Sequence, residues 1–215
     1  MSNDTSLKES VLAELAWEPS VTAAHIGVTA RDGVVTLTGH VKAYYEKHAA
    51  EAAARRVKGV KAVAEEIEVK LPSDVKRGDE EIAAAVISRL SWDSRIPKNA
   101  IKATVQKGWV TLTGEVDWHF EHDAAAKDVR ALWGVIGVTN EVKIKPRVNT
   151  FTVSSDITKA LHRAWFDESN VKVTADGGRI KLTGKVDSWS DRMLAGTTAW
   201  AAPGATAVEN DLVIA

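Results

Sequence analysis

Three copies of one nine-residue segment constrain the fold of this 215-residue chain more than any other feature of its sequence. They read GVVTLTGHV at 33–41, GWVTLTGEV at 108–116 and GRIKLTGKV at 178–186. The residues around the segment also align without a gap, under a shift of 75 residues for the second copy and 145 for the third. Because a fixed internal period indicates repeated structural units, three homologous modules are predicted. They span residues 3–71, 79–145 and 154–215.

Each module is predicted to begin with a helix. The helix follows a capping box, Ser6-x-x-Glu9, in the first module, and Asp79 and Ser155 are the expected helix starts in the others. Apolar residues then recur at helical spacing, and these residues are expected to face the core. They are Leu7, Val11, Leu12 and Leu15 in the first module, and Ile82, Val86, Ile87 and Leu90 in the second.

Two runs of alternating apolar and polar residues follow, joined in every module by a turn that contains glycine, such as Asp32-Gly33. Glycine can adopt the positive φ that a tight hairpin requires. An alanine-rich helix and a third strand complete the module, and this crossover puts the helix on one face of the sheet. The predicted fold class is α+β: three tandem α-β-β-α-β modules, each a small three-stranded mixed sheet with two helices on one face. Leu37, Leu112 and Leu182 are expected to be equivalent buried residues.

Composition excludes several functions. Lysine and arginine total 28 against 29 aspartate and glutamate, so no large basic field is available for nucleic acid. No cysteine is present, which excludes disulfides and thiolate metal sites. The first residues lack the pattern of a secretory signal, and no apolar run is long enough to span a bilayer. A cytoplasmic protein, at most peripheral to a membrane, is expected.

The repeated Gly-x-Val-x-Leu-x-Gly-x-Val segment resembles the BON domain, named for bacterial osmotically inducible and nodulation proteins. A later Gly-Val-x-x-Val-x-x-x-Ile pattern at 59–67 extends this resemblance, which covers all three modules. The chain is similar to triple-BON proteins that lack a signal peptide. The resemblance implies a non-catalytic binding protein, without a cofactor, that associates with phospholipid or envelope surfaces in osmotic or envelope stress.

Aromatic residues stand at the start of each second helix and are candidates for a shared binding surface. This second-helix aromatic group comprises Tyr44, Tyr45, Trp118, His119, Phe120 and Trp189. Rings with polar tips suit the boundary between water and lipid headgroups, whereas ordinary packing would bury them. If the group binds a partner, at least one of its rings is expected to be exposed in every module.

Three further tryptophans lie near the ends of the first helices: Trp17, Trp92 and Trp165. Large aromatic side chains are buried in most proteins. These three are therefore expected to pack in the module cores.

A cationic cluster ends the second helix of the first module and comprises Arg55, Arg56, Lys58 and Lys61. Each of these charges could add about 1 kcal/mol of attraction to an anionic bilayer. Cations at a helix C-terminus also stabilise its dipole, so a purely structural role is the alternative.

The recurring glycines Gly39, Gly114 and Gly184 are predicted between the second strand and the second helix. Their backbone could approach an anion at the helix N-terminus. A sharp turn with positive φ explains them without a ligand, and no phosphate-binding glycine pattern surrounds them. They are therefore interpreted as structural turn glycines.

His119 and His122 are one helical turn apart, beside Glu121 and Asp123, and could supply two metal ligands. The aligned pairs in the other modules are Tyr44 with Lys47 and Trp189 with Arg192. Because neither sister pair can bind a metal, a solvated helix start without a metal is expected. No catalytic motif is recognisable either, so an enzyme is not expected.

The sequence is compatible with two functions. The leading interpretation is a binding protein that docks on phospholipid or envelope surfaces. The alternative is a soluble scaffold that binds a protein, another copy of itself or a small nucleotide-like ligand through the aromatic group and the open sheet faces. The nearly balanced charge favours this alternative.

Overall fold

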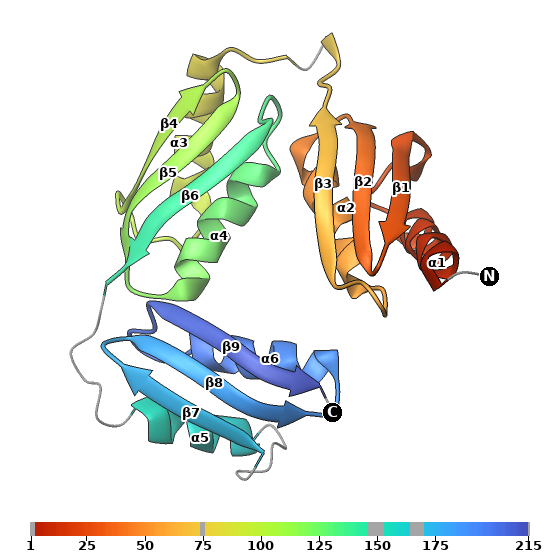
Figure 1. Ribbon diagram of the computed structural model, residues 1–215. Helices are drawn as coiled ribbons and strands as arrows, with labels where there is room; N and C mark the ends of the chain where they lie inside the picture. The colour runs from red at the N-terminus through yellow and green to blue at the C-terminus, as the bar shows by residue number, and fades with distance from the viewer. Residues whose placement is uncertain (1–2, 74–75, 146–152, 164–169, 215) are drawn as a thin grey trace. The chain divides into compact units, whose positions relative to one another are not determined.

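The computed structural model describes residues 3–73, 76–145, 153–163 and 170–214. Every module runs helix, strand, strand, helix, strand, as predicted (Figure 1). The first module comprises α1 (Asn3–Trp17), the short 3-10 helix η1 (Ala23–His25), β1 (Ile26–Arg31), β2 (Val34–Val41), α2 (Tyr44–Arg56) and β3 (Ala62–Val69). The second comprises α3 (Asp79–Trp92), β4 (Ile101–Gln106), β5 (Trp109–Val116), α4 (His119–Arg130) and β6 (Gly137–Ile144). The third comprises α5 (Val153–Arg163), β7 (Val171–Asp176), β8 (Arg179–Val186), α6 (Trp189–Trp200) and β9 (Ala207–Ile214).

Two helices begin earlier than their sequence signals predict. α1 begins at Asn3, so Ser6 lies within its first turns, where its carbonyl accepts a hydrogen bond from the Ser10 hydroxyl. α5 begins at Val153, two residues before Ser155. Helix ends shift by one or two residues more easily than helix centres, because terminal turns have fewer hydrogen bonds to hold them.

Each module has one three-stranded sheet with its second strand in the centre. In the first module β2 runs antiparallel to β1, with Leu37 opposite Val28, and parallel to β3. The third module repeats this register, with Leu182 opposite Val173. The sheets are therefore mixed, and the α+β fold class is confirmed.

The cores lie between each sheet and its helices. In the first and third modules both helices pack on the same face of the sheet (Figure 1). Leu37, Leu112 and Leu182 are completely buried at equivalent positions, as predicted. In the first module Val11 and Leu15 of α1 join the same core as Leu37.

Backbone with positive φ recurs in every module at the hairpin turn, inside the central strand and at the glycine that follows the second helix. The hairpin turns hold two consecutive left-handed residues, such as Asp32 with φ 53° and Gly33 with φ 85°. The second place is inside the central strand, where the φ values of Gly39, Gly114 and Gly184 are 117°, 138° and 131°. A Cβ on Gly39 would lie 2.0 Å from the carbonyl oxygen of His25, so only glycine fits. These glycines thus lie within strands, not after them.

A polar contact ties the second helix to the third strand in every module, and we call it the strand–helix clasp. In the first module the Lys47 ammonium pairs with the Glu65 carboxylate at 2.9 Å. In the third module Arg192 donates to the Asn210 carbonyl at 2.7 Å. In the second module only the His122 carbonyl takes part, accepting from the Asn140 side chain at 2.8 Å. The third module also has this last bond, from the Asn210 side chain to the Arg192 carbonyl at 2.8 Å, so the modules differ in what the side chain of the helix residue does.

Candidate functional site

The second-helix aromatic group presents one well-exposed ring in each module. The exposed fractions are 44% for Tyr45, 54% for Phe120 and 52% for Trp189. Tyr44, Trp118 and His119 are only partly exposed. The Arg192 guanidinium lies 5.0 Å from the centre of the Trp189 ring, close enough for a cation–π contact. Every module therefore exposes at least one ring of the group, as a binding surface requires. The remaining rings are partly buried in their own modules.

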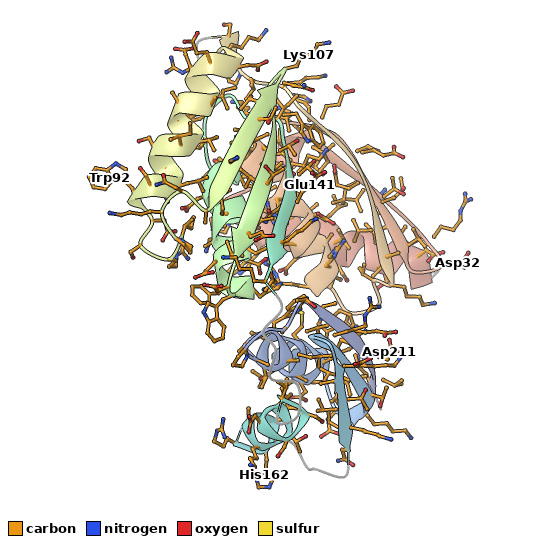
Figure 2. All side chains as sticks on the ribbon, turned by 90° about the vertical axis from the view of Figure 1, so that its left-hand side faces the viewer. Asp32, Trp92, Lys107, Glu141, His162 and Asp211 are labelled. Carbon is orange, nitrogen blue, oxygen red and sulfur yellow. The ribbon has the colours of Figure 1, made fainter. Side chains whose placement is uncertain are left out.

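The tryptophans at the ends of the first helices do not pack in the core, which corrects the prediction for Trp17 and Trp92. They are 84% and 83% exposed, and Figure 2 shows Trp92 pointing away from its helix. In α1 the buried positions are Val11 and Leu15, and Trp17 follows Leu15 by two residues, about 200° around the helix. That rotation turns the indole outward. Trp165 lies outside the described residues.

The same helices carry further exposed apolar residues. Leu12 and Ile87 were also expected to face the core, and both are exposed. Leu12, Ala13, Ala16 and Trp17 form the first-helix apolar face of the first module. In the second module Ile87 and Trp92 occupy the positions aligned with Leu12 and Trp17. Only one side of each helix can contact the sheet, so the wide apolar pattern of the sequence extends beyond the buried stripe.

The cationic cluster is largely engaged inside its own module. The Arg55 guanidinium pairs with Glu51 at 2.6 Å. The Arg56 guanidinium lies 2.9 Å from Glu14 and 2.8 Å from Glu18. Its hydrogen bond, together with that of the Ser20 hydroxyl, holds the pKa of the Glu18 carboxyl below its ordinary value. Two of the four cations are thus neutralised by acidic neighbours.

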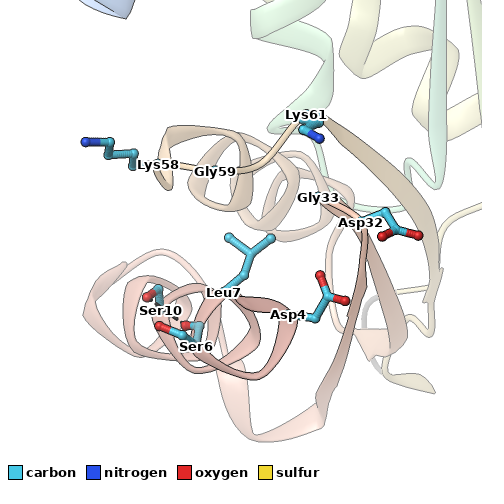
Figure 3. A pocket seen from close by; sticks show the side chains of 9 residues that line it. All are labelled: Asp4, Ser6, Leu7, Ser10, Asp32, Gly33, Lys58, Gly59 and Lys61. Carbon is cyan, nitrogen blue, oxygen red and sulfur yellow. Dashed lines mark hydrogen bonds between the residues drawn. The ribbon is translucent and has the colours of Figure 1, made fainter. Parts of the chain in front are cut away.

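The other two cations, Lys58 and Lys61, line a hollow of about 380 Å³ in the first module (Figure 3). Its lining residues are Asp4, Ser6, Leu7, Ser10, Asp32, Gly33, Lys58, Gly59 and Lys61. Two aspartates and two lysines are among these residues, so the formal charges of the lining cancel. Tyr45 stands at the start of α2 and Arg56 at its end, about 16 Å apart along the helix axis. The aromatic and cationic candidates therefore do not form one surface.

In the second module, the region that corresponds to this hollow contains a hydrogen-bonded aspartate side chain. Asp79 aligns with Asp4, and its carboxylate accepts hydrogen bonds from the amides of Lys107 and Gly108 at 2.7 and 2.8 Å. The carboxylate thus joins the start of α3 to the β4–β5 hairpin. We call this contact the hairpin clamp.

His119, His122 and Asp123 come together on the first turns of α4. One carboxylate oxygen of Asp123 lies 3.2 Å from Nδ1 of His119, and the other lies 3.0 Å from Nδ1 of His122. The ligand atoms of the three side chains all lie within 4.8 Å of one another. Burial lowers the pKa of His119, which favours its neutral form. With one oxygen close to each ring, the Asp123 carboxylate bridges the two imidazoles.

Sequence reasoning missed Trp109, an exposed tryptophan on the open face of the second sheet. Its indole N–H donates to the Thr139 hydroxyl at 2.8 Å. A Cβ on Gly137 would lie 2.4 Å from the Trp109 ring, so the ring lies directly over this glycine. The available signal was that only the second module pairs a tryptophan with a glycine here, because the aligned positions are Val34 with Ala62 and Arg179 with Ala207.

The buried carboxylates have structural partners. Glu46 accepts from the Thr22 amide at 3.2 Å, and Glu121 accepts from the amides of Asp117 and Trp118. Asp128 pairs with Arg89 at 3.0 Å. Carboxylates held in this way close helix starts and join helices, and they are not arranged as a pair across a substrate cleft.

Three tandem α-β-β-α-β modules that share one repeated segment define a modular α+β protein, and the chain belongs to the BON domain family. The family matches residues 3–70, 78–146 and 149–215, which confirms the resemblance noted in the sequence. Osmotically-inducible protein Y of Escherichia coli K12 is 28% identical over 150 residues, which cover 66% of this chain and 73% of that protein.

Two solved structures show lower similarity to the chain. CdsD, a structural protein of the type III secretion system of Chlamydia trachomatis, is 20% identical, with 98% of this chain and 92% of that chain covered and a TM-score of 0.26. The PrgH periplasmic domain is 11% identical, with coverages of 89% and 95% and a TM-score of 0.23. Within the described residues, no helix has both the length and the apolar character needed to cross a membrane.

Proposed function

We propose that this protein is a non-catalytic binding protein that associates with phospholipid surfaces through aromatic side chains on its helices, in osmotic or envelope stress. The observation that carries the proposal is the pair Trp17 and Trp92, which occupy aligned positions and are each more than four-fifths exposed. An indole combines a large apolar body with a polar N–H and therefore favours the headgroup region of a bilayer. The exposed rings of the second-helix aromatic group add further anchors of the same type.

Charge has a minor part in this proposal. The formal net charge is −1, and Arg55 and Arg56 are paired with glutamates. Long-range attraction to an anionic leaflet is therefore weak, and insertion of apolar side chains has to supply most of the binding energy. The similarity to an osmotically inducible protein supports the link to osmotic stress.

Cosedimentation of the full chain with vesicles tests the proposal. We expect binding to phosphatidylcholine vesicles, and only modestly stronger binding when phosphatidylglycerol is added. The double variant Trp17→Ala/Trp92→Ala should bind at least about tenfold more weakly, because each buried apolar anchor contributes on the order of 1–2 kcal/mol. Trp133→Ala is the matched control, since Trp133 is also exposed but lies outside both helix surfaces. No binding to either vesicle would refute the proposal.

A soluble scaffold is the second candidate, and the placement of Trp109 favours it. Its ring covers part of an open sheet face and is held by Thr139, which makes a flat, preorganised contact surface. Such a surface suits a protein or a planar ligand better than a bilayer. If a partner captured by the full chain were lost in Trp109→Ala but retained in the Trp17/Trp92 variant, the scaffold would be the better description.

A further inference from the structure

We propose that His119, His122 and Asp123 form a binding site for a divalent cation of the zinc type in the second module. Two imidazole nitrogens and one carboxylate oxygen are the ligand set that Zn²⁺ accepts, with water in the fourth position. The ligand atoms lie within 4.8 Å of one another. Ligands of a tetrahedral zinc stand about 3.3 Å apart, because each bond is about 2.0–2.1 Å long. A small rotation of the side chains would thus open room for the ion.

The absence of these ligands in the sister modules does not argue against the site. At the position of His122, Lys47 and Arg192 use their side chains in the strand–helix clasp. His122 contributes only its backbone carbonyl to that clasp, and its imidazole turns to Asp123 instead. The Asn140 side chain still donates to the His122 carbonyl, as the Asn210 side chain donates to the Arg192 carbonyl in the third module, so helix and strand stay joined without the imidazole. The imidazole is therefore available for another role.

A bound cation would also need the negative charge of Asp123. The start of a helix carries a partial positive charge, which disfavours a bound cation. The ionised carboxylate between the two rings offsets that field and supplies the hard oxygen ligand. In the first module the position of Asp123 holds His48, and in the third it holds Met193. The three-ligand set therefore belongs to the second module.

Titration of the full chain with Zn²⁺, followed by calorimetry, tests the site. We expect one ion to bind per chain, and the affinity to fall at least about tenfold in His122→Ala and in Asp123→Asn. His48→Ala and Glu141→Gln are matched controls, because they remove an exposed histidine in another module and an exposed acid in the same one. Both controls should keep the wild-type affinity.

Co²⁺ gives a second, structural readout that does not depend on affinity. Visible absorption typical of four-coordinate Co²⁺ should appear with the wild-type chain and vanish in Asp123→Asn, with the circular dichroism of the two proteins unchanged. An affinity that is equal in the wild type, His122→Ala and Asp123→Asn would overturn the proposal. So would an equal loss of affinity in His48→Ala.

Discussion

At the residue scale, side chains of the same type have opposite environments in this protein. Leu37 and Leu112 are completely buried in the sheets, whereas Leu12 is exposed on the outside of α1. Trp17 and Trp92 are exposed at helix ends, although indoles are usually packed. Because these two tryptophans occupy aligned positions, the exposed indole is a repeated feature of the first two modules. Substitutions can therefore separate residues that stabilise the fold from residues that are available for binding.

Leu112→Ala should lower the free energy of unfolding of the second module by about 2–5 kcal/mol, because it removes a buried side chain and leaves a cavity. Leu12→Ala makes the same chemical change at an exposed position and should cost less than about 0.5 kcal/mol. Urea denaturation followed by circular dichroism measures both. A loss below about 1 kcal/mol for Leu112→Ala would mean that the side chain does not fill the core.

The Glu18 carboxyl should titrate below its ordinary pKa of 4.5 because it accepts hydrogen bonds from Arg56 and Ser20. Its folded-state pKa is depressed, so its contribution to stability is present above the unfolded pKa and is lost as the pH falls through the folded value. Carboxyl NMR titration should show a higher pKa for Glu18 in Arg56→Ala, with Ser20 preventing a full return. Arg55→Ala, which removes the partner of Glu51 instead, should leave the Glu18 pKa unchanged.

At the element scale, each module joins its helices to its sheet through a few polar contacts whose side chains differ between modules. The strand–helix clasp uses Lys47, the His122 carbonyl or Arg192. The hairpin clamp uses Asp79 in the second module. In the described part of the chain, Asp4 makes no such hydrogen bond to the amides of Asp32 and Gly33, and the corner remains a hollow.

Asp79→Ala should destabilise the second module by about 1 kcal/mol, the usual cost of losing a side chain that caps backbone amides. The amides of Lys107 and Gly108 should also exchange faster with deuterium, because their acceptor is removed. Asp4→Ala is the matched control in the first module and should change neither quantity measurably there. Unchanged protection of Lys107 and Gly108 would show that the clamp does not persist in solution.

At the scale of the whole molecule, the chain is a series of three small sheets, each with its own helices. The first and third modules each have a separate buried core, Val11 to Ile67 in one and Ile157 to Leu212 in the other. A sheet of this size with two helices can bury enough apolar surface to fold as a unit. The sequence predicts the boundaries between these units at 71–79 and 145–154.

Limited proteolysis with trypsin should cut first after the exposed residues Lys76 and Arg77, which lie between the first and second predicted modules. Fragments of module size should then persist, because the basic residues within elements are protected by backbone hydrogen bonds. Mass spectrometry identifies the cut sites. Early cleavage at Arg31 or Lys107, which are exposed hairpin residues within modules, would contradict the predicted boundaries.

The sequence by itself determined the three modules, the order of their elements and the buried leucines of the central strands. These features depend on a repeat and on local periods of two and 3.6 residues, which are visible along the chain. It also identified the second-helix aromatic group, although not which of its rings are exposed.

The tertiary structure decided which side of each first helix is buried and which cations are free. Leu12 and Trp17 belong to an apolar pattern that cannot indicate by itself how far around the helix the sheet extends. Arg56 meets Glu14 across 42 residues of sequence, a contact that no local pattern predicts. Local propensity depends on neighbours in the chain, whereas exposure and ion pairing depend on neighbours in space, and these exist only after the helices have packed on the sheet.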